Sequence, residues 1–98
     1  MDRYIIDEWV AYSNNDLEVV HQLLTFHPPK LEIICYHCQQ SAEKILKAFC
    51  LYSDIEPPRT HNLKFLREKC EEIDKSFMEL INECNRLNIY SVQPRYPF

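Results

Sequence analysis

"KLEIICYHCQQSAEKILKAFCLYSD", residues 30–54, gives the strongest helix signal in the chain, because its apolar positions recur at three- and four-residue steps. The positions on this apolar stripe are Leu31, Ile34, Cys35, Cys38, Ala42, Ile45, Leu46 and Phe49. The opposite side carries Glu32, Gln39, Glu43, Lys44 and Lys47. Glu43 and Lys47 have the order and spacing that stabilise a helix. We therefore expect segment 30–54 to be the central helix of a bundle.

Prolines divide the rest of the chain into segments. The six prolines stand in three places, at positions 28 and 29, 57 and 58, and 94 and 97. The residue before a proline is pushed out of helical dihedrals, so helices are expected to stop at these places. Glycine is absent, although sheet proteins of this size use glycines at hairpins and bulges. The sequence therefore predicts an all-α fold.

Three further helices are expected. The first spans residues 4–26, with Asp2 at its N-cap. The third lies in "RTHNLKFLREKCEEI", with Thr60 or Asn62 as its cap. The fourth runs from about residue 74 or 76 to residue 87 or 90. The expected inward positions are Ile5, Ile6, Trp9, Leu17, Val20, Leu23 and Leu24 in the first, Leu63, Leu66, Cys70 and Ile73 in the third, and Phe77, Leu80, Ile81, Cys84 and Leu87 in the fourth. Short loops then favour an up-and-down antiparallel four-helix bundle, with residues 1–98 forming one domain.

Composition excludes several classes of protein. The 98 residues include 11 basic and 15 acidic side chains, a net charge of −4, which argues against a whole-molecule electrostatic grip on nucleic acid or an anionic membrane. No apolar run approaches the roughly 20 residues of a membrane span, and the first ten residues do not resemble a signal peptide. We expect a cytoplasmic protein without a membrane partner. Without glycine, no phosphate-binding loop can form, and we expect no cofactor.

The cysteines and the polar stretch at residues 13–16 need separate consideration. "CYHC" at 35–38 resembles half of a zinc site, but Cys35 and Cys38 lie on the apolar stripe, whereas His37 projects elsewhere and no second ligand pair follows. We expect no metal site, and we interpret the five cysteines as buried thiols.

Short polar side chains compete with the helical backbone, so residues 13–16 predict either a kink or a functional polar patch in the first helix.

His61 lies in a loop at a helix start, where a side chain is displayed rather than packed. The simpler interpretation is that "RTHN" only caps the third helix. Four basic residues lie between positions 59 and 69, against the single acid Glu68, and they could form a phosphate-facing surface, although a solvated helix face is commoner. They are Arg59, Lys64, Arg67 and Lys69.

The order of features resembles the HEPN family, small helical domains often found in prokaryotes beside minimal nucleotidyltransferases. The resemblance rests on Trp9, on Asp16 with Leu17, on "CQQSAEKILKAF", on "THNLKFL" and on "YSVQPRYP". It implies a bundle of four or five helices that dimerises, with a polar site near the dimer interface. A full fifth helix, which usually follows the RYP segment in the family, is expected to be missing, which would favour association or indicate a truncated product.

Many HEPN proteins are metal-independent ribonucleases that use an arginine and a histidine, and the resemblance carries the arginine onto Arg86. Tyr90 and Ser91 stand where the histidine is expected, and a phenol is a poor base at neutral pH. The tail is similar to the RYP-type subgroup, which generally departs from the ribonuclease pattern in this way. Arg95 and Tyr96 would then belong to a polar site, or the aromatic tail would cover the open end of the bundle.

Three functions follow as hypotheses. The leading one is a non-catalytic or weakly catalytic HEPN partner of a minimal nucleotidyltransferase, in a toxin–antitoxin-like or nucleotide-binding pair, with Arg86, Tyr90, Arg95 and Tyr96 as the residues that bind a nucleotide or RNA or become modified. The alternative is a metal-independent ribonuclease toxin in which Arg86 and Arg95 support charge and His61 supplies the base. The third is a structural interaction domain. A homodimer or higher oligomer is expected.

Overall fold

The computed structural model describes residues 2–92 and places four α-helices in them. They are α1 (Arg3–Leu23), α2 (Leu31–Tyr52), α3 (Leu63–Glu71) and α4 (Ile81–Asn88), with a 3₁₀-helix, η1 (Lys75–Leu80), before α4. No strand occurs in this part of the chain, and the predicted all-α bundle is confirmed. Among its helices none is long and apolar enough to cross a membrane. The expectation about a fifth helix concerns residues outside the described range.

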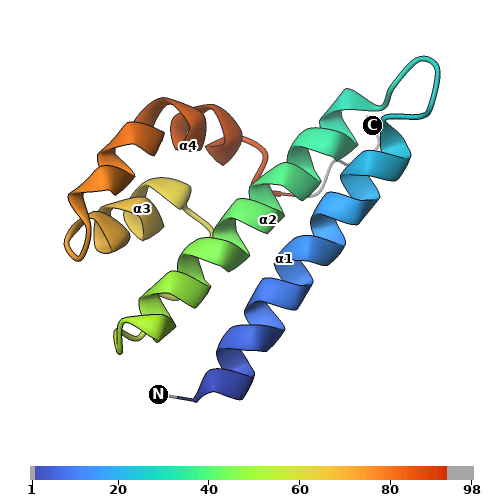
Figure 1. Ribbon diagram of the computed structural model, residues 1–98. Helices are drawn as coiled ribbons and strands as arrows, with labels where there is room; N and C mark the ends of the chain where they lie inside the picture. Colours follow the sequence, from blue (N-terminus) through green and yellow to red (C-terminus); the bar gives the residue numbers. More distant parts are fainter. Residues whose placement is uncertain (1, 93–98) are drawn as a thin grey trace.

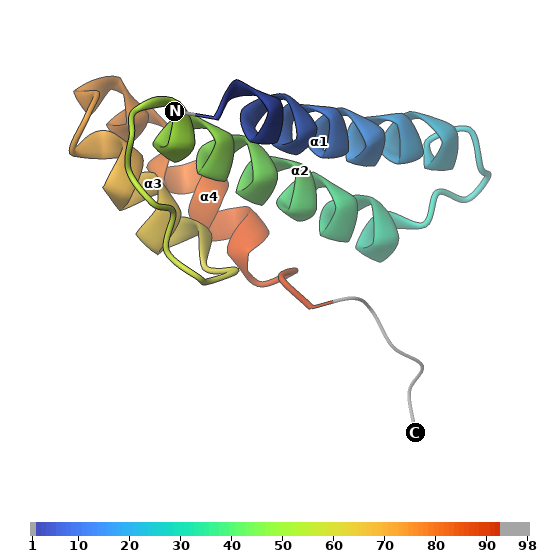
Figure 2. The same cartoon turned by 90° about the horizontal axis from the view of Figure 1, so that it is seen from below.

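The helices are arranged around α2 (Figures 1 and 2). α1 lies antiparallel along one side of α2, and α3, η1 and α4 form a second group on its other side. Within residues 2–92, α1 contacts α2 but neither of the two short α-helices, whereas α2 contacts α1, α3 and α4. The predicted central position of α2 is therefore confirmed.

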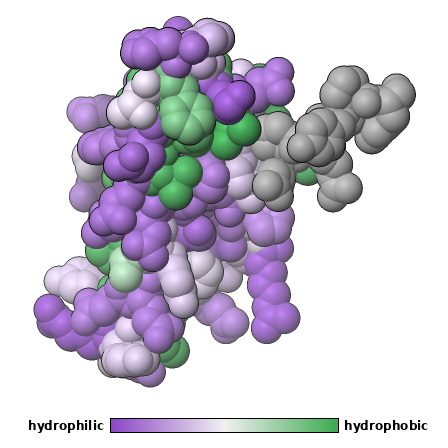
Figure 3. Space-filling view, turned by 90° about the vertical axis from the view of Figure 1, so that its right-hand side faces the viewer, coloured by the Kyte–Doolittle hydropathy of each residue, from purple (hydrophilic) through white to green (hydrophobic). Residues whose placement is uncertain are grey.

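The turn between α1 and α2 lies at the first proline pair, as predicted. α1 ends at Leu23, three residues before the predicted end, and α2 begins at Leu31. Asp2 caps α1 as expected, because its Oδ1 accepts a hydrogen bond from the Tyr4 amide at 2.9 Å. Leu24, Phe26 and Leu31 at this turn are exposed. Figure 3 shows hydrophobic side chains gathered at the upper end of an otherwise mostly hydrophilic face.

Polar side chains join α1 to α2, which resolves the two interpretations of residues 13–16 in favour of a polar patch within an unbroken helix. The Ser13 hydroxyl lies 2.8 Å from the Ser41 hydroxyl and donates to the Ser41 carbonyl at 3.0 Å. Asp16 accepts from Lys44 Nζ at 2.6 Å, and its other oxygen lies 2.9 Å from His37 Nδ1. Ser13 and Asp16 are buried. Each buried polar group on α1 therefore has a partner on α2, as burial requires.

The hydrophobic core lies on the other side of α2. Its buried members are Leu46, Cys50, Leu63, Leu66, Cys70 and Cys84. Phe49 and Phe77 pack beside them with ring centroids 4.7 Å apart. All five cysteines are free thiols, with three buried and Cys35 and Cys38 half-buried. The interpretation of the cysteines as buried thiols is thus confirmed for the three in the core.

The apolar stripes were predicted only in part. Val20, Ile34, Leu46, Leu63, Leu66, Cys70 and Cys84 are buried as expected. Exposed instead are Ile5, Leu17, Leu24, Leu31, Ile45, Ile73, Leu80 and Ile81. On the side of α2 that was expected to be polar, Gln39, Glu43 and Lys47 are buried. The physical reason is that neighbours cover α2 on two sides and leave part of its apolar stripe uncovered.

The C-terminal end of α2 is closed by a Schellman motif. The amide of Ile55 donates to the Cys50 carbonyl at 2.8 Å, and the amide of Asp54 donates to the Leu51 carbonyl at 3.0 Å. Asp54 has φ = 59°, the left-handed conformation that glycine usually supplies and that this chain must obtain from another residue. Ile55 then packs against the core. This motif directs residues 55–62 back along α2.

The fourth predicted helix is divided into η1 and α4. Asp74 caps η1, because its Oδ1 accepts from the Ser76 amide at 2.9 Å and from the Ser76 hydroxyl at 2.7 Å. These hydrogen bonds lower the pKa of Asp74. α4 ends at Asn88, between the two ends predicted for it.

Candidate functional site

Three polar side chains, one helical turn apart, line the side of α2 that faces residues 55–62. Gln39, Glu43 and Lys47 are 0%, 4% and 9% exposed. Glu43 Oε2 accepts a hydrogen bond from Lys47 Nζ at 2.9 Å. Gln39 Nε2 donates to the His61 carbonyl at 2.9 Å. This row therefore holds the loop that leads into α3.

His61 extends from this loop with its ring oriented by Glu43. Its Nδ1 lies 3.0 Å from both carboxylate oxygens of Glu43, and its side chain is 72% exposed. A carboxylate only accepts hydrogen bonds, so Nδ1 carries the proton. In the neutral ring Nε2 then keeps its lone pair and is free to accept a proton or to contact a ligand.

The start of α3 is fixed by asparagines from two helices. Asn62 is the N-cap, because its Oδ1 accepts from the Lys64 amide at 2.9 Å, while Thr60 Oγ1 accepts from the Asn62 amide at 3.0 Å. Asn88 at the end of α4 accepts from the Leu63 amide and donates from Nδ2 to Asn62 Oδ1, both at 2.9 Å. The end of α4 is thereby held beside the loop that carries His61.

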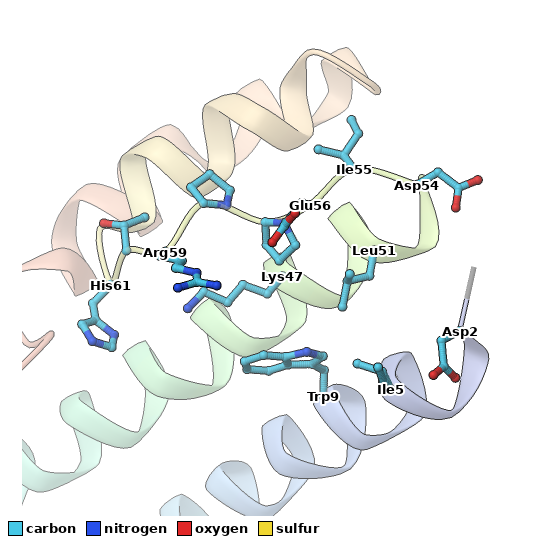
Figure 4. A pocket seen from close by; sticks show the side chains of 13 residues that line it. Asp2, Ile5, Trp9, Lys47, Leu51, Asp54, Ile55, Glu56, Arg59 and His61 are labelled. Atoms are coloured by element: carbon cyan, nitrogen blue, oxygen red, sulfur yellow. The ribbon is translucent and has the colours of Figure 1, made fainter.

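A cavity of about 730 Å³ opens between the N-terminal part of α1, the C-terminal part of α2 and the loop. We call it the Trp9 pocket, and its lining is Asp2, Ile5, Trp9, Lys47, Leu51, Asp54, Ile55, Glu56, Pro57, Pro58, Arg59, Thr60 and His61. Figure 4 shows Lys47, Arg59 and His61 gathered toward one end, with Asp2 and Asp54 at the other. Lys47 Nζ lies 5.6 Å from the centroid of the Trp9 ring, a cation–π contact. The pocket therefore has basic side chains at one end, Asp2 and Asp54 at the other, and Glu56 together with apolar side chains between them.

Comparison with known proteins places the chain in a family. The model of the family described as "HEPN domain" matches residues 6–98. The chain belongs to the HEPN family. No curated protein and no solved structure matches it significantly.

Of the residues expected to form the site of this HEPN domain, the structure describes Arg86, Tyr90 and His61. Arg86 is exposed on α4, and Tyr90, half-buried, follows the end of that helix. Arg86 and Asn88 are two residues apart on a helix and so project from different sides. Asn88 is the α4 residue that bonds the start of α3, and no hydrogen bond joins Arg86 to His61. Arg95 and Tyr96 lie outside the described residues.

The basic residues after position 58 do not form one phosphate-facing surface. Arg67 is buried and pairs with Glu71 through NH1, and Lys69 Nζ lies 3.4 Å from Glu72 Oε2. Arg59 instead lines the Trp9 pocket. Among residues 2–92, no group of three or more His, Cys, Asp or Glu side chains is suited to hold a metal.

Glu43, Gln39 and Lys47 are the site residues that sequence reasoning missed as a group. Their spacing of four residues was visible, and the Glu43–Lys47 pair was recognised as a helix-stabilising pair. The signal for more was that this spacing continues to Gln39, which gives a third polar residue on the same side. The loop that covers them could not be placed without the fold.

Proposed function

We propose that this HEPN protein is a non-catalytic or weakly catalytic cytoplasmic module that binds a nucleotide or RNA and acts as the partner of a minimal nucleotidyltransferase in a toxin–antitoxin-like pair. The observation that carries the proposal is the exposed arginine at position 86, followed one turn later by Tyr90 where ribonucleases of the family have a histidine. A guanidinium can bind a phosphate without any proton transfer. A phenol ordinarily keeps its proton at neutral pH, so the pair favours binding over cleavage.

The partner would act on this chain by nucleotidyl transfer to Tyr90 or Tyr96. In that step the tyrosine oxygen bonds to the α-phosphorus of a nucleoside triphosphate, pyrophosphate leaves and the phenolic proton passes to solvent. Co-expression with the nucleotidyltransferase from the neighbouring gene, followed by intact-mass measurement, is expected to show one added nucleotidyl group. Tyr90→Phe and Tyr96→Phe identify the acceptor. Unmodified protein that also fails to co-purify with the partner contradicts the proposal.

A homodimer is part of the proposal. Its support is the group of large apolar side chains exposed at the turn between α1 and α2, namely Leu24, Phe26 and Leu31, since exposed apolar surface tends to be covered by association. Sedimentation velocity over a hundredfold range of concentration is expected to give a dimer. A monomer throughout that range contradicts this part.

The ribonuclease alternative is favoured by one specific observation, the hydrogen bonds between Glu43 and the exposed His61 ring. A carboxylate that fixes one ring nitrogen makes the other a general base, here for the 2′-hydroxyl of RNA. Metal-free incubation with RNA tests it with His61→Gln and Arg86→Ala. Cleavage that either substitution abolishes supports the alternative, whereas no cleavage, or equal cleavage by all three proteins, eliminates it.

A further inference from the structure

We propose that the Trp9 pocket is a binding site for a small molecule that joins a planar apolar ring to one anionic group, of which adenosine monophosphate is a representative. The inference depends on the pocket's own geometry. It adds a second site to the proposed function, which includes nucleotide binding through other residues, Arg86, Tyr90, Arg95 and Tyr96.

The size and lining of the pocket fit such a molecule. Its volume of about 730 Å³ is within the range of about 300–1,000 Å³ typical of small-molecule sites. Apolar side chains from all three segments line it, namely Ile5 and Trp9 of α1, Leu51 of α2, and Ile55, Pro57 and Pro58 of the loop. Figure 4 shows Trp9 and Ile5 on one wall, facing the loop that carries Ile55. A flat apolar ring between these walls would be removed from water on both faces.

The basic end supplies the contacts for the anionic group. The charge of Lys47 is already balanced by Glu43 at 2.9 Å. Arg59 is exposed, and within residues 2–92 no carboxylate forms an ion pair with it. Its guanidinium can therefore bind a phosphate or carboxylate with two parallel hydrogen bonds. His61 presents Nε2 at the same end, because Glu43 holds Nδ1. In the neutral ring this nitrogen accepts a hydrogen bond, so it can bind a hydroxyl group of the ligand beside the anionic group.

The acidic residues limit the charge of the ligand. Asp2, Asp54 and Glu56 line the same cavity. Figure 4 shows Asp2 and Asp54 far from Arg59 and His61, with Glu56 between the two ends. A chain of phosphates extending along the pocket would approach these carboxylates and be repelled. A ring that carries hydrogen-bond donors, such as an amino group, would meet acceptors there. This charge separation favours one anionic group at one end of the molecule.

Trp9 provides the measurement, because it is the only tryptophan in the chain. Its fluorescence is followed during titration with adenosine monophosphate, adenosine, adenosine triphosphate and inorganic phosphate. We expect saturable quenching with the monophosphate, at least tenfold weaker binding of adenosine and of phosphate, and no gain in affinity for the triphosphate. Arg59→Ala is expected to weaken binding of the monophosphate by about tenfold, the effect of one charge-assisted contact.

Two control variants distinguish this site from others. Lys64→Ala removes an exposed positive charge on α3 outside the pocket, and it is expected to leave the affinity unchanged. Arg86→Ala is also expected to have no effect. Loss of binding in Arg86→Ala but not in Arg59→Ala would overturn the inference and assign the ligand to α4. Equal binding of adenosine or phosphate alone, or no quenching by any probe, would overturn it as well.

Discussion

At the scale of single residues, Glu43 affects both the stability of the fold and the orientation of the His61 ring. Its two buried oxygens receive hydrogen bonds from Lys47 on the same helix and from His61 beyond the loop. Lys47 is itself buried, so the carboxylate is the group that compensates its charge. One side chain thus stabilises a buried ammonium and determines which nitrogen of an exposed imidazole is available.

Glu43→Gln is expected to destabilise the fold by roughly 3–5 kcal/mol, the usual cost of leaving a buried charge without its partner. Urea unfolding followed by circular dichroism measures the change. The matched control is Glu32→Gln, an exposed position on the same helix, where little change is expected. Adding Lys47→Met to Glu43→Gln should restore most of the loss, and a double variant as unstable as Glu43→Gln would refute this account of Glu43.

The same residue marks the limit of sequence reasoning at this scale. His61 was recognised from the local sequence pattern alone, because a histidine just before a helix cap is exposed. Glu43 and Gln39 were assigned to the side of α2 opposite its apolar stripe. That assignment follows correctly from helical geometry. The chain returns to Glu43 and Gln39 at His61, 18 and 22 residues later, and helical periodicity does not predict that return.

At the scale of elements, the path of the loop depends on how α2 ends. Asp54 adopts φ = 59° in the Schellman motif that turns the chain toward the Trp9 pocket. β-Branched residues are disfavoured in this conformation, at about 1–2 kcal/mol. Asp54→Val is therefore expected to be less stable than Asp54→Gly by about this amount in thermal unfolding. Both variants lack the carboxylate, so their difference in stability reports the backbone conformation at position 54. Equal stability of the two variants would contradict the strain assigned to a β-branched residue there.

The junction between α3 and α4 depends on Asn88. Its side chain satisfies the Leu63 amide and bonds the Asn62 cap, each at 2.9 Å. Asn88→Ala leaves that amide without an acceptor and is expected to cost about 1–3 kcal/mol. Asn85→Ala, exposed on the same helix, is the control and should be near neutral. Hydrogen exchange of the Leu63 amide should accelerate in Asn88→Ala alone. Unchanged protection of that amide would show that Asn88 does not hold the junction.

Element boundaries followed from proline and capping chemistry, and for this reason they were predictable. Asp2, Asn62 and Asp74 cap helices, and the proline pairs lie in the two connections between the first three helices. The division of the last predicted helix into η1 and α4 was not foreseen. Its apolar positions fit either helix type over so short a segment, and the choice is made by packing against α3.

At the scale of the whole molecule, the fold has a small core in which cysteines are prominent. Three of its six buried members are Cys50, Cys70 and Cys84. The bundle class followed from the absence of glycine and the helical periodicity, but the uneven distribution of apolar contacts around α2 did not. Burial raises the pKa of all three thiols, and for Cys70 the neighbouring Cys50 adds to burial and raises it to about 12.

The stability of the whole fold is consequently expected to fall in alkaline solution. Above the ordinary thiol pKa of 9.0, Cys70 of the unfolded chain releases its proton while the native thiol keeps it, so the unfolded state binds fewer protons and the free energy of unfolding decreases as pH rises. This contribution is fully present below pH 9 and is lost toward about pH 12. Urea unfolding at intervals from pH 8 upward measures it. The wild type should lose stability more steeply than Cys70→Ala, by at most about 1.4 kcal/mol per pH unit. Both proteins carry the same tyrosines and lysines, so parallel pH profiles would mean that the Cys70 thiol is not shielded in the core.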